Sequence, residues 1–267
     1  MVLAILTAAG LNLAHAQTRL DAAYRVTLLG LSIGKFAGTL DVDQNRFVAT
    51  ATGATAGLLW IFASGHGDVT ARGTVAAGQP IVSNYAMNIV AGEYSDDIQI
   101  SFTGGKARED IRGPAVSPNP NRVPLTDAHR VGVVDPLTAL LIYVPGTGDT
   151  AVPKACERSV AVFDGRMRYD LRLSFKRIDQ VKTDEGYRGP VVVCSIYFSP
   201  VAGYDPRRPG IKYLSAQRDM ELTLAPIAGT RLLMTYRMAV PTPIGVGVLQ
   251  AIRFDTQPRR SLATKDQ

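Results

Sequence analysis

Short segments in which apolar and polar residues alternate run along most of the chain, and this pattern constrains the fold more than any other feature. The clearest segment is residues 166–175, in which every second residue is apolar, in the order Met, Tyr, Leu, Leu and Phe. A period of two places the apolar residues on one face of a β-strand and the polar residues on the other. We therefore expect a strand with one buried face and one solvated face.

Similar segments are separated by Gly, Asp, Asn and Pro, which predicts antiparallel strands joined by tight turns. The Asp164-Gly165 pair indicates a type I′ hairpin before residue 166. The fold class that follows is all-β, with a curved antiparallel sheet in the form of an up-and-down open barrel or a β-spiral. The predicted strands are residues 24–29, 33–42, 46–55, 68–75, 81–90, 95–103, 159–163, 166–175, 191–198, 214–224, 231–240 and 245–254.

One short helix and one proline-rich loop interrupt the predicted strands. Asp135 is suited to an N-cap and Pro136 to the first helical position, and apolar residues follow at helical spacing up to Val144. Residues 113–134 carry four prolines, too many for a central strand. We expect this loop to act as a lid or to wrap over a sheet.

The first sixteen residues predict a cleavable secretory signal. Residues 2–14 are uncharged and mostly apolar, and they lead into Ala14-His15-Ala16, a small-x-small cleavage pattern. The apolar stretch is shorter than the roughly 20 residues that a transmembrane helix needs, and no later segment is long enough either. We expect cleavage after Ala16, a periplasmic location, a single β-rich domain over residues 17–256 and a flexible tail over residues 257–267.

Cys156 and Cys194 are the only cysteines, and an even count in an exported chain predicts one disulfide. In a plain meander the two cysteines would lie on strands separated by a third strand, about 9 to 10 Å apart. That separation exceeds the Cα distance that a disulfide tolerates. We therefore expect residues 154–158 to leave the sheet and fold over one face or edge.

The remaining inventory argues against metal sites, cofactors and the familiar enzyme classes. If the cysteines are oxidised and His15 leaves with the signal, only His66 and His129 remain, too few for ordinary zinc sites. The motifs of zinc proteases, serine hydrolases, P-loop enzymes and EF-hands are absent. The formal net charge of +6 is spread among acidic residues, which is typical of a solvated surface. We predict no metal, no cofactor, no nucleic acid partner and no enzymatic activity.

Two weak constellations concern catalysis. His66, Asp68, Asp127, His129 and Asp135 are the only residues from which a histidine–carboxylate site could be built, and surface positions are the simpler interpretation. A pair of carboxylates at residues 96 and 97 is expected to lie on opposite faces of a strand. We interpret that pair as part of a solvated edge and not as a glycosidase pair.

Two further groups are candidates for binding. Leu58, Leu59, Trp60 and Phe62 belong to the densest apolar run after the signal, which predicts either a buried strand or plug or the wall of an apolar pocket. Arg207 and Arg208 lie between prolines and could bind an anionic group through their guanidinium donors, although an ordinary exposed turn is the simpler interpretation.

Four stretches resemble a known family. They are Tyr24 to Gly34, Asp135-Pro-Leu-Thr-Ala-Leu-Leu141, Val162-Phe-Asp-Gly-Arg-Met-Arg-Tyr-Asp-Leu171 and Gly189-Pro-Val-Val-Val-Cys194. Together they resemble the DUF3108 family of exported bacterial envelope proteins of unassigned function. More distantly, the chain is similar to periplasmic β-spiral envelope-integrity proteins and to half-barrel lipoprotein carriers. That resemblance implies a curved sheet around an apolar groove and assigns no catalytic residues.

These observations lead to one hypothesis and two alternatives. The leading hypothesis is a non-enzymatic periplasmic protein that binds a lipid-like, acyl-bearing or peptide partner in a curved β-sheet. The first alternative is a scaffold that binds another envelope protein through a sheet edge or the proline-rich loop. The second is a hydrolase with an unrecognised site.

Overall fold

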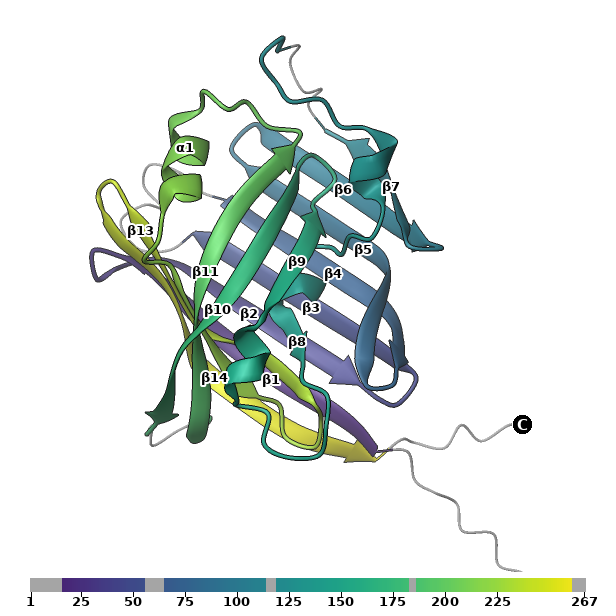
Figure 1. The fold of residues 1–267 in the computed structure, drawn as a ribbon, viewed down its shortest axis with the longest axis vertical. Helices are drawn as coiled ribbons and strands as arrows, with labels where there is room; N and C mark the ends of the chain where they lie inside the picture. Colours follow the sequence, from purple (N-terminus) through teal and green to yellow (C-terminus); the bar gives the residue numbers. More distant parts are fainter. Residues whose placement is uncertain (1–15, 56–64, 114–118, 183–185, 261–267) are drawn as a thin grey trace, which may run out of the picture.

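Long antiparallel strands form a single sheet that curls around an apolar interior (Figure 1). The computed structural model describes residues 16–55, 65–113, 119–182 and 186–260. Its strands are β1 (Ala16–Leu28), β2 (Leu31–Val42), β3 (Arg46–Thr55), β4 (Gly65–Ala76), β5 (Gln79–Ala91), β6 (Tyr94–Thr103), β7 (Lys106–Arg112), β8 (Leu141–Tyr143), β9 (Arg158–Phe163), β10 (Arg168–Val181), β11 (Gly189–Ala202), β12 (Glu221–Pro226), β13 (Leu232–Thr242) and β14 (Gly245–Arg260).

The strand order confirms the predicted curved antiparallel sheet. The order is β7-β6-β5-β4-β3-β2-β1-β14-β13-β12-β11-β10-β9, and β8 pairs with β13 outside this path. Each half is therefore a meander of sequence neighbours, and the two halves meet where β1 pairs with β14. The sheet nearly closes into a barrel, with one seam between β7 and β9.

The seam carries a strap in place of a strand ladder. The amide of Gly132 donates to the carbonyl of Gly105, at the β6–β7 turn, over 2.8 Å. Two residues later, the amide of Val134 donates to Ala161 on β9, and Phe163 donates back to Val134, both over 2.9 Å. Residues 131–134 thus connect the two edges and satisfy part of their backbone hydrogen bonds.

Two ion pairs reinforce the same seam. Arg130, in the short 3-10 helix η2 (Asp127–Arg130), pairs with Glu109 on β7 and lies 5.6 Å from the ring centroid of Phe163 on β9. Arg166, in the β9–β10 turn, pairs with Asp96 on β6 over 2.6 Å. Asp96 is therefore buried and paired, and its interpretation as a solvated edge residue is wrong because the far edge of the sheet returns to cover it.

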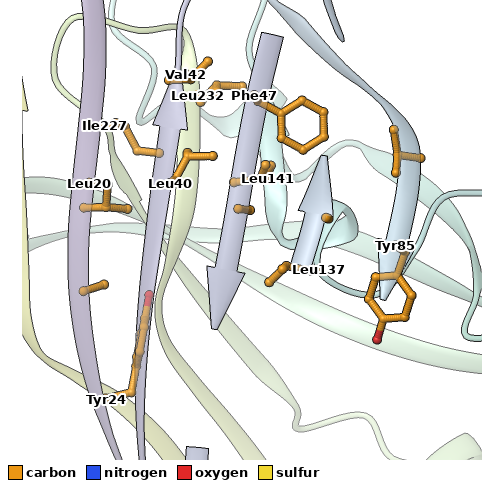
Figure 2. Packing of buried hydrophobic residues seen from close by; sticks show 14 of the residues in the cluster. Leu20, Tyr24, Leu40, Val42, Phe47, Tyr85, Leu137, Leu141, Ile227 and Leu232 are labelled. Carbon is orange, nitrogen blue, oxygen red and sulfur yellow. The ribbon is translucent and has the colours of Figure 1, made fainter. Parts of the chain in front are cut away.

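The barrel core fills the interior between the two halves. Figure 2 shows side chains such as Leu20, Leu40 and Phe47 on β1 to β3 gathered with Leu141 and Leu232. Burial of such large apolar side chains contributes roughly 1.5 to 3 kcal/mol each to folding.

A second group, the outer cluster, lies on the opposite face of β10 to β13. It comprises Ile142, Val144, Ala155, Cys156, Leu173, Val192, Cys194, Ile196, Met220, Leu222, Leu224 and Leu233. The central strands of the C-terminal half are therefore buried on both faces, and Val191 to Cys194 form a continuous buried run.

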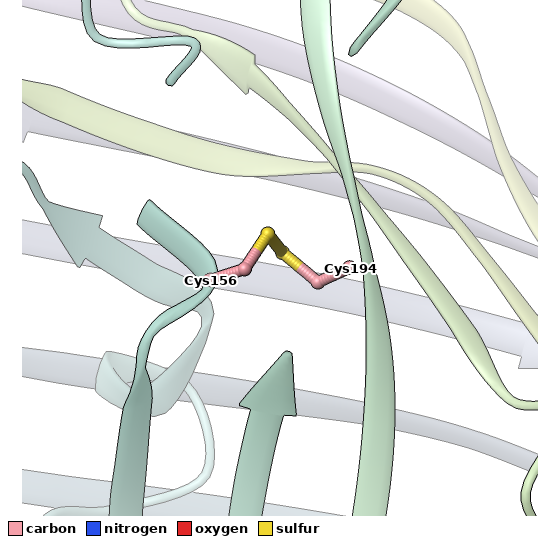
Figure 3. The surroundings of a disulfide bond; sticks show 2 residues. All are labelled: Cys156 and Cys194. Carbon is pink, nitrogen blue, oxygen red and sulfur yellow. A yellow bond between two sulfur atoms is a disulfide. The ribbon is translucent and has the colours of Figure 1, made fainter. Parts of the chain in front are cut away.

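The predicted disulfide is confirmed and lies within the outer cluster. Cys156 ends the 3-10 helix η4 (Pro153–Cys156), which leaves the sheet and packs over β10 and β11. Cys194 lies on β11, and the two Cα atoms are 5.5 Å apart (Figure 3). The expectation that residues 154–158 leave the sheet is therefore correct for the part that carries the cysteine.

The helix predicted over residues 135–144 is wrong. Asp135 does accept hydrogen bonds from the amides of Leu137 and Thr138, both over 2.9 Å, but only the 3-10 turn η3 (Thr138–Leu140) follows. Residues 141–143 then pair with β13 as β8. Pairing with a neighbouring strand outweighs the local helical spacing, because it buries successive residues on two different sides.

Other boundaries also differ from the sequence predictions. Residues 106–112 form the unpredicted strand β7. The helix of the structure, α1 (Pro209–Ala216), takes the first part of the predicted strand 214–224. Strand β14 continues to Arg260 and pairs with β1, so residues 257–260, assigned to the tail from the sequence, belong to the sheet.

The apolar and polar residues that alternate over residues 166–175 are only partly divided into buried and exposed side chains. On β10, Leu173 is buried but Phe175 is exposed, and β9 pairs with β10 only as far as Leu173. The Asp164-Gly165 hairpin is present, but it is not type I′. Gly165 alone of the pair has a positive φ, whereas type I′ needs two, and the Asp164 carboxylate accepts from the amides of Arg166 and Met167.

Candidate ligand pocket

An apolar pocket of about 490 Å³ opens at one end of the barrel, on the inner face of β1 to β5. Leu40, Phe47, Ala49 and Ala71 are buried in the barrel core and therefore face inward. Every second residue along the same strand shares that face, which identifies the other inward residues. The inward residues that line the pocket are Val26, Gly34, Phe36, Ala51, Gly53, Thr55, Gly65, Gly67, Val69, Met87, Ile89 and Ala91.

The pocket exists because small residues face inward in register on three strands. Gly53 on β3 lies opposite Phe36 on β2 and Gly67 on β4, and Gly67 in turn lies opposite Ile89 on β5. A Cβ atom at Gly53 would lie 2.2 Å from Cδ1 of Phe36, so the phenyl ring packs directly on the glycine backbone. Glycine within a strand often marks such a close approach.

A smaller cavity of about 200 Å³ continues the apolar space toward the barrel core. Leu20, Tyr24 and Leu40 form one side of it, and Leu137 and Leu140, just before β8, form another. Phe36 and Ala51 line both spaces, so the Phe36 ring stands between them.

The inward side chains of the pocket provide almost no polar chemistry. Thr55 is the hydroxyl-bearing residue among them, and its oxygen accepts a hydrogen bond from the amide of Gly65 over 3.0 Å. Deeper in, the Tyr24 hydroxyl donates to the carbonyl of Thr235 over 2.8 Å, and burial raises the pKa of this phenol. The pocket can therefore hold an apolar group, and its inward side chains include no acid–base pair.

Apolar side chains in this pocket also remain in contact with solvent. Phe36 is 43% exposed and Ile89 is 36% exposed, although both lie on the inner face of the barrel. Apolar side chains on the inner face of a barrel normally pack against one another. Their exposure shows that the chain's own described residues leave this part of the interior unfilled.

The histidine–carboxylate constellation is not assembled. His66 and Asp68 border the pocket on β4, but they alternate with its inward residues and are exposed. Asp127 pairs with Lys106 at the seam, and the ring of His129 accepts from the amide of Thr126. Among the described residues, no group of three or more His, Cys, Asp or Glu side chains could hold a metal ion.

The two predicted binding groups have different outcomes. Leu58, Leu59, Trp60 and Phe62 lie outside the described residues. Arg207 forms a salt bridge with the buried carboxylate of Asp205 over 2.9 Å, and its Nε and Nη2 both donate to that residue. Arg208 is exposed and precedes α1. The guanidinium of Arg207 is thus already engaged within the protein.

Two further hollows lie along β4 to β7 and are polar in character. They measure about 490 and 710 Å³, and Arg108 and Glu109 line both. Their other lining side chains include Arg72, Gln99 and Asp127. An apolar ligand would find no apolar wall of comparable extent there.

The sequence reasoning missed the glycine and alanine wall of the apolar pocket. The signal that could have found it is the recurrence of small residues at alternate strand positions, such as Gly34 and Gly38 on β2 and Gly65 and Gly67 on β4. Glycine weakens a strand interior, so its repetition on one face indicates a surface that must stay hollow.

A family model describes most of this architecture. The model of the "Protein of unknown function (DUF3108)" family matches residues 23–251. The chain belongs to the DUF3108 family. The match includes every residue that lines the pocket, together with both cysteines of the disulfide.

Comparison with solved structures and curated proteins adds little beyond this. A crystal structure described as a beta-barrel-like protein of domain of unknown function DUF1849, from Brucella abortus, is similar to the chain at 8% identity with a TM-score of 0.48. The similarity covers 91% of this chain and 98% of the other. Among curated proteins, none matches the sequence.

Proposed function

We propose that this DUF3108 protein is a non-enzymatic protein of the bacterial cell envelope that binds an acyl chain or a similar lipid-like group in the apolar pocket. The observation that carries the proposal is the glycine-lined pocket of about 490 Å³ on the inner face of β1 to β5, whose inward side chains carry no charge. Ligand pockets in proteins are concave, mostly apolar and commonly about 300 to 1,000 Å³ in volume.

The chemistry of the wall favours an acyl chain over a peptide. A peptide carries an amide donor and a carbonyl acceptor at each residue, and burying such groups without partners costs several kcal/mol. The inward side chains offer chiefly the Thr55 hydroxyl, which is already bonded to Gly65. A methylene chain has no such requirement, and each buried methylene contributes about 0.8 kcal/mol.

The location we propose is the periplasm. The signal-like first sixteen residues support it, and so does the Cys156–Cys194 disulfide, since such bonds persist mainly in oxidising compartments. No helix among the described residues is long and apolar enough to cross a membrane.

The scaffold alternative receives less support from the sheet edges. On the side of β10 away from β11, no strand among the described residues pairs with residues 174–181. That edge carries Lys176, Arg177 and a β-bulge, which are features that protect edge strands from pairing with other chains. We therefore favour ligand binding in the interior.

Titration with cis-parinaric acid, whose fluorescence rises in apolar sites, tests the proposal. Ala51→Trp should fill the space that connects the two cavities and weaken binding by at least about tenfold. Thr52→Trp is the matched control, because residue 52 alternates with Ala51 and is exposed on the outer face. The proposal fails if the purified protein does not bind the probe, or if both variants bind it as the wild type does.

A second measurement asks what the protein holds in its own compartment. We expect native mass spectrometry of protein prepared from the periplasm to show a mass excess that organic extraction removes and that Ala51→Trp lacks. A mass equal to that of the processed polypeptide in every preparation would contradict a carrier role.

A further inference from the structure

Two neighbouring hairpins carry exposed aliphatic side chains at the same end of the barrel as the pocket. Leu29 and Leu31, at the β1–β2 turn, are 67% and 59% exposed, and Ile244 and Val246, at the β13–β14 turn, are 66% and 48% exposed. Single exposed apolar residues are ordinary on protein surfaces, whereas a cluster of them marks an interaction site. We call these four residues the apolar tip.

The four residues form one surface because the two hairpins are paired. Leu28 on β1 lies opposite Gly247 on β14, next to both turns. A Cβ atom at Gly245 would lie 2.3 Å from Cδ2 of Leu29, so the Leu29 side chain packs over the other hairpin. Both hairpins project on the left of Figure 1, the β1–β2 turn in purple and the β13–β14 turn in yellow.

The backbone conformation at residue 29 indicates that the needs of folding alone do not explain why a leucine is found there. Leu29 and Gly30 have φ values of +53° and +79°, the positive pair that a type I′ turn requires. Asn, Asp and Gly are preferred at the first of these positions, and a bulky side chain there is uncommon. An exposed leucine in a conformation that disfavours it is more readily explained by a contact with another molecule.

A row of basic residues lies directly behind the apolar tip. In the sheet register, Lys35 on β2 pairs with Arg25 on β1, Arg25 pairs with Gln250 on β14, and Gln250 pairs with Arg237 on β13. These four residues share a face, and within the described part of the chain none of the three cations forms a salt bridge. From this row to the two turns, the four strands contain no Asp or Glu.

We propose that the apolar tip and its basic row form a docking surface for a bilayer that contains anionic phospholipids. Aliphatic side chains would enter the interfacial region, and Arg25, Lys35 and Arg237 would lie at the level of the negatively charged head groups. The same β1–β2 hairpin contributes Val26, Ile33 and Gly34 to the pocket wall, so docking brings the pocket close to the lipid. The docking surface does not depend on what the pocket binds.

Co-sedimentation of the mature protein with vesicles tests this surface. We expect the protein to bind vesicles of phosphatidylcholine mixed with phosphatidylglycerol at least about tenfold more tightly than phosphatidylcholine alone, and salt to weaken the binding. Leu29→Asn combined with Ile244→Asn should reduce binding about tenfold. Leu29→Asn alone should leave the melting temperature unchanged or raise it, because Asn suits the turn, and this separates loss of docking from loss of folding.

Matched controls separate a local surface from general attraction. Ile81→Asn removes an aliphatic side chain that is 50% exposed near the β4–β5 turn at the other end of the barrel, and it should leave binding unchanged. Arg25→Gln with Lys35→Gln should weaken binding to the anionic vesicles only. Arg72→Gln with Arg108→Gln removes the same charge from another face and should have little effect.

The outcomes distinguish this proposal from the ligand proposal. Ala51→Trp should dock on vesicles like the wild type even if it no longer binds cis-parinaric acid. The docking proposal is overturned if the wild type does not bind anionic vesicles, or if folded Leu29→Asn/Ile244→Asn binds them undiminished. It is also overturned if the Arg72/Arg108 variant loses as much binding as the Arg25/Lys35 variant.

Discussion

The pocket wall and the outer cluster are built from the same kind of strand but are packed in opposite ways. On β11, Val191 to Cys194 are all buried, because the barrel core covers one face and the outer cluster covers the other. On β3, Gly53 and Ala51 face the pocket, and the outer residue Thr52 is exposed. One region buries both faces of its strands, and the other leaves a hollow on its inner face.

The difference indicates a division of labour within one sheet. Close packing on both faces, together with a cross-link, stabilises the C-terminal strands. A wall of small residues has little to pack against, so it contributes less to folding and leaves space for a ligand. We therefore expect substitutions in the outer cluster to change stability and substitutions in the pocket wall to change binding.

Removal of the disulfide should have the largest effect on stability. The bond closes a loop with a sequence separation of 38, for which the chain-entropy model gives about 4 kcal/mol. Cys156→Ala with Cys194→Ala should lower the free energy of unfolding in urea by about that amount. The wild type in reducing agent should match the double variant, and a loss below about 1 kcal/mol would show that the outer cluster holds without its cross-link.

Truncation of one apolar side chain in each region tests the comparison directly. Leu224, fully buried in the outer cluster, should lose about 3 kcal/mol of unfolding free energy on change to Ala. Met87, half-buried on the pocket wall, should lose less than about 1 kcal/mol on the same change, because solvent or ligand already borders it. Equal losses in urea denaturation would contradict the division of labour.

The strands and the disulfide could be predicted because their signals are local or come from a small inventory. Alternation and turn residues located β2 to β6 to within a few residues, whereas β1 begins at Ala16, well before the predicted start at residue 24. The geometric conflict in a plain meander correctly placed Cys156 outside the sheet. Each of these conclusions depends on the chain's own neighbours or on the dimensions of a sheet.

The errors arose where tertiary pairing decides the outcome. Leu137, Leu140 and Leu141 have helical spacing, yet only a 3-10 turn forms and residues 141–143 become β8, because β13 offers a partner strand. The burial of Asp96 could not be predicted, because no sequence pattern indicates that Arg166 returns to it from the far edge of the sheet. The pocket depends on register between β2, β3, β4 and β5, which alternation within one strand does not determine.

The last expected effect on the free energy of unfolding concerns Asp135, in the segment that joins the barrel core to the outer cluster. Leu137 and Leu141 from this segment enter the barrel core, whereas Ile142 and Val144 enter the outer cluster. Asp135 is completely buried, and burial raises the pKa of its carboxyl group above the ordinary value. The stability that Asp135 contributes is therefore present below the unfolded pKa and is lost as pH rises through the folded pKa.

Asp135→Asn keeps an oxygen that can accept from the amides of Leu137 and Thr138 but removes the buried charge. Relative to the wild type, the variant should gain about 1 kcal/mol of unfolding free energy between about pH 4 and pH 7. Asp205→Asn is the control of opposite sign, because hydrogen bonds from Arg207 and Asn119 hold the pKa of Asp205 well below its usual range. The window for Asp205 lies at lower pH, because a lowered folded pKa adds stability only as pH rises toward the unfolded pKa. Urea unfolding from about pH 2 to about pH 5 should show the Asp205 variant losing stability relative to the wild type as pH rises. If the Asp135 variant instead follows the wild-type pH profile, the buried charge of Asp135 does not limit the stability of the segment that joins the barrel core to the outer cluster.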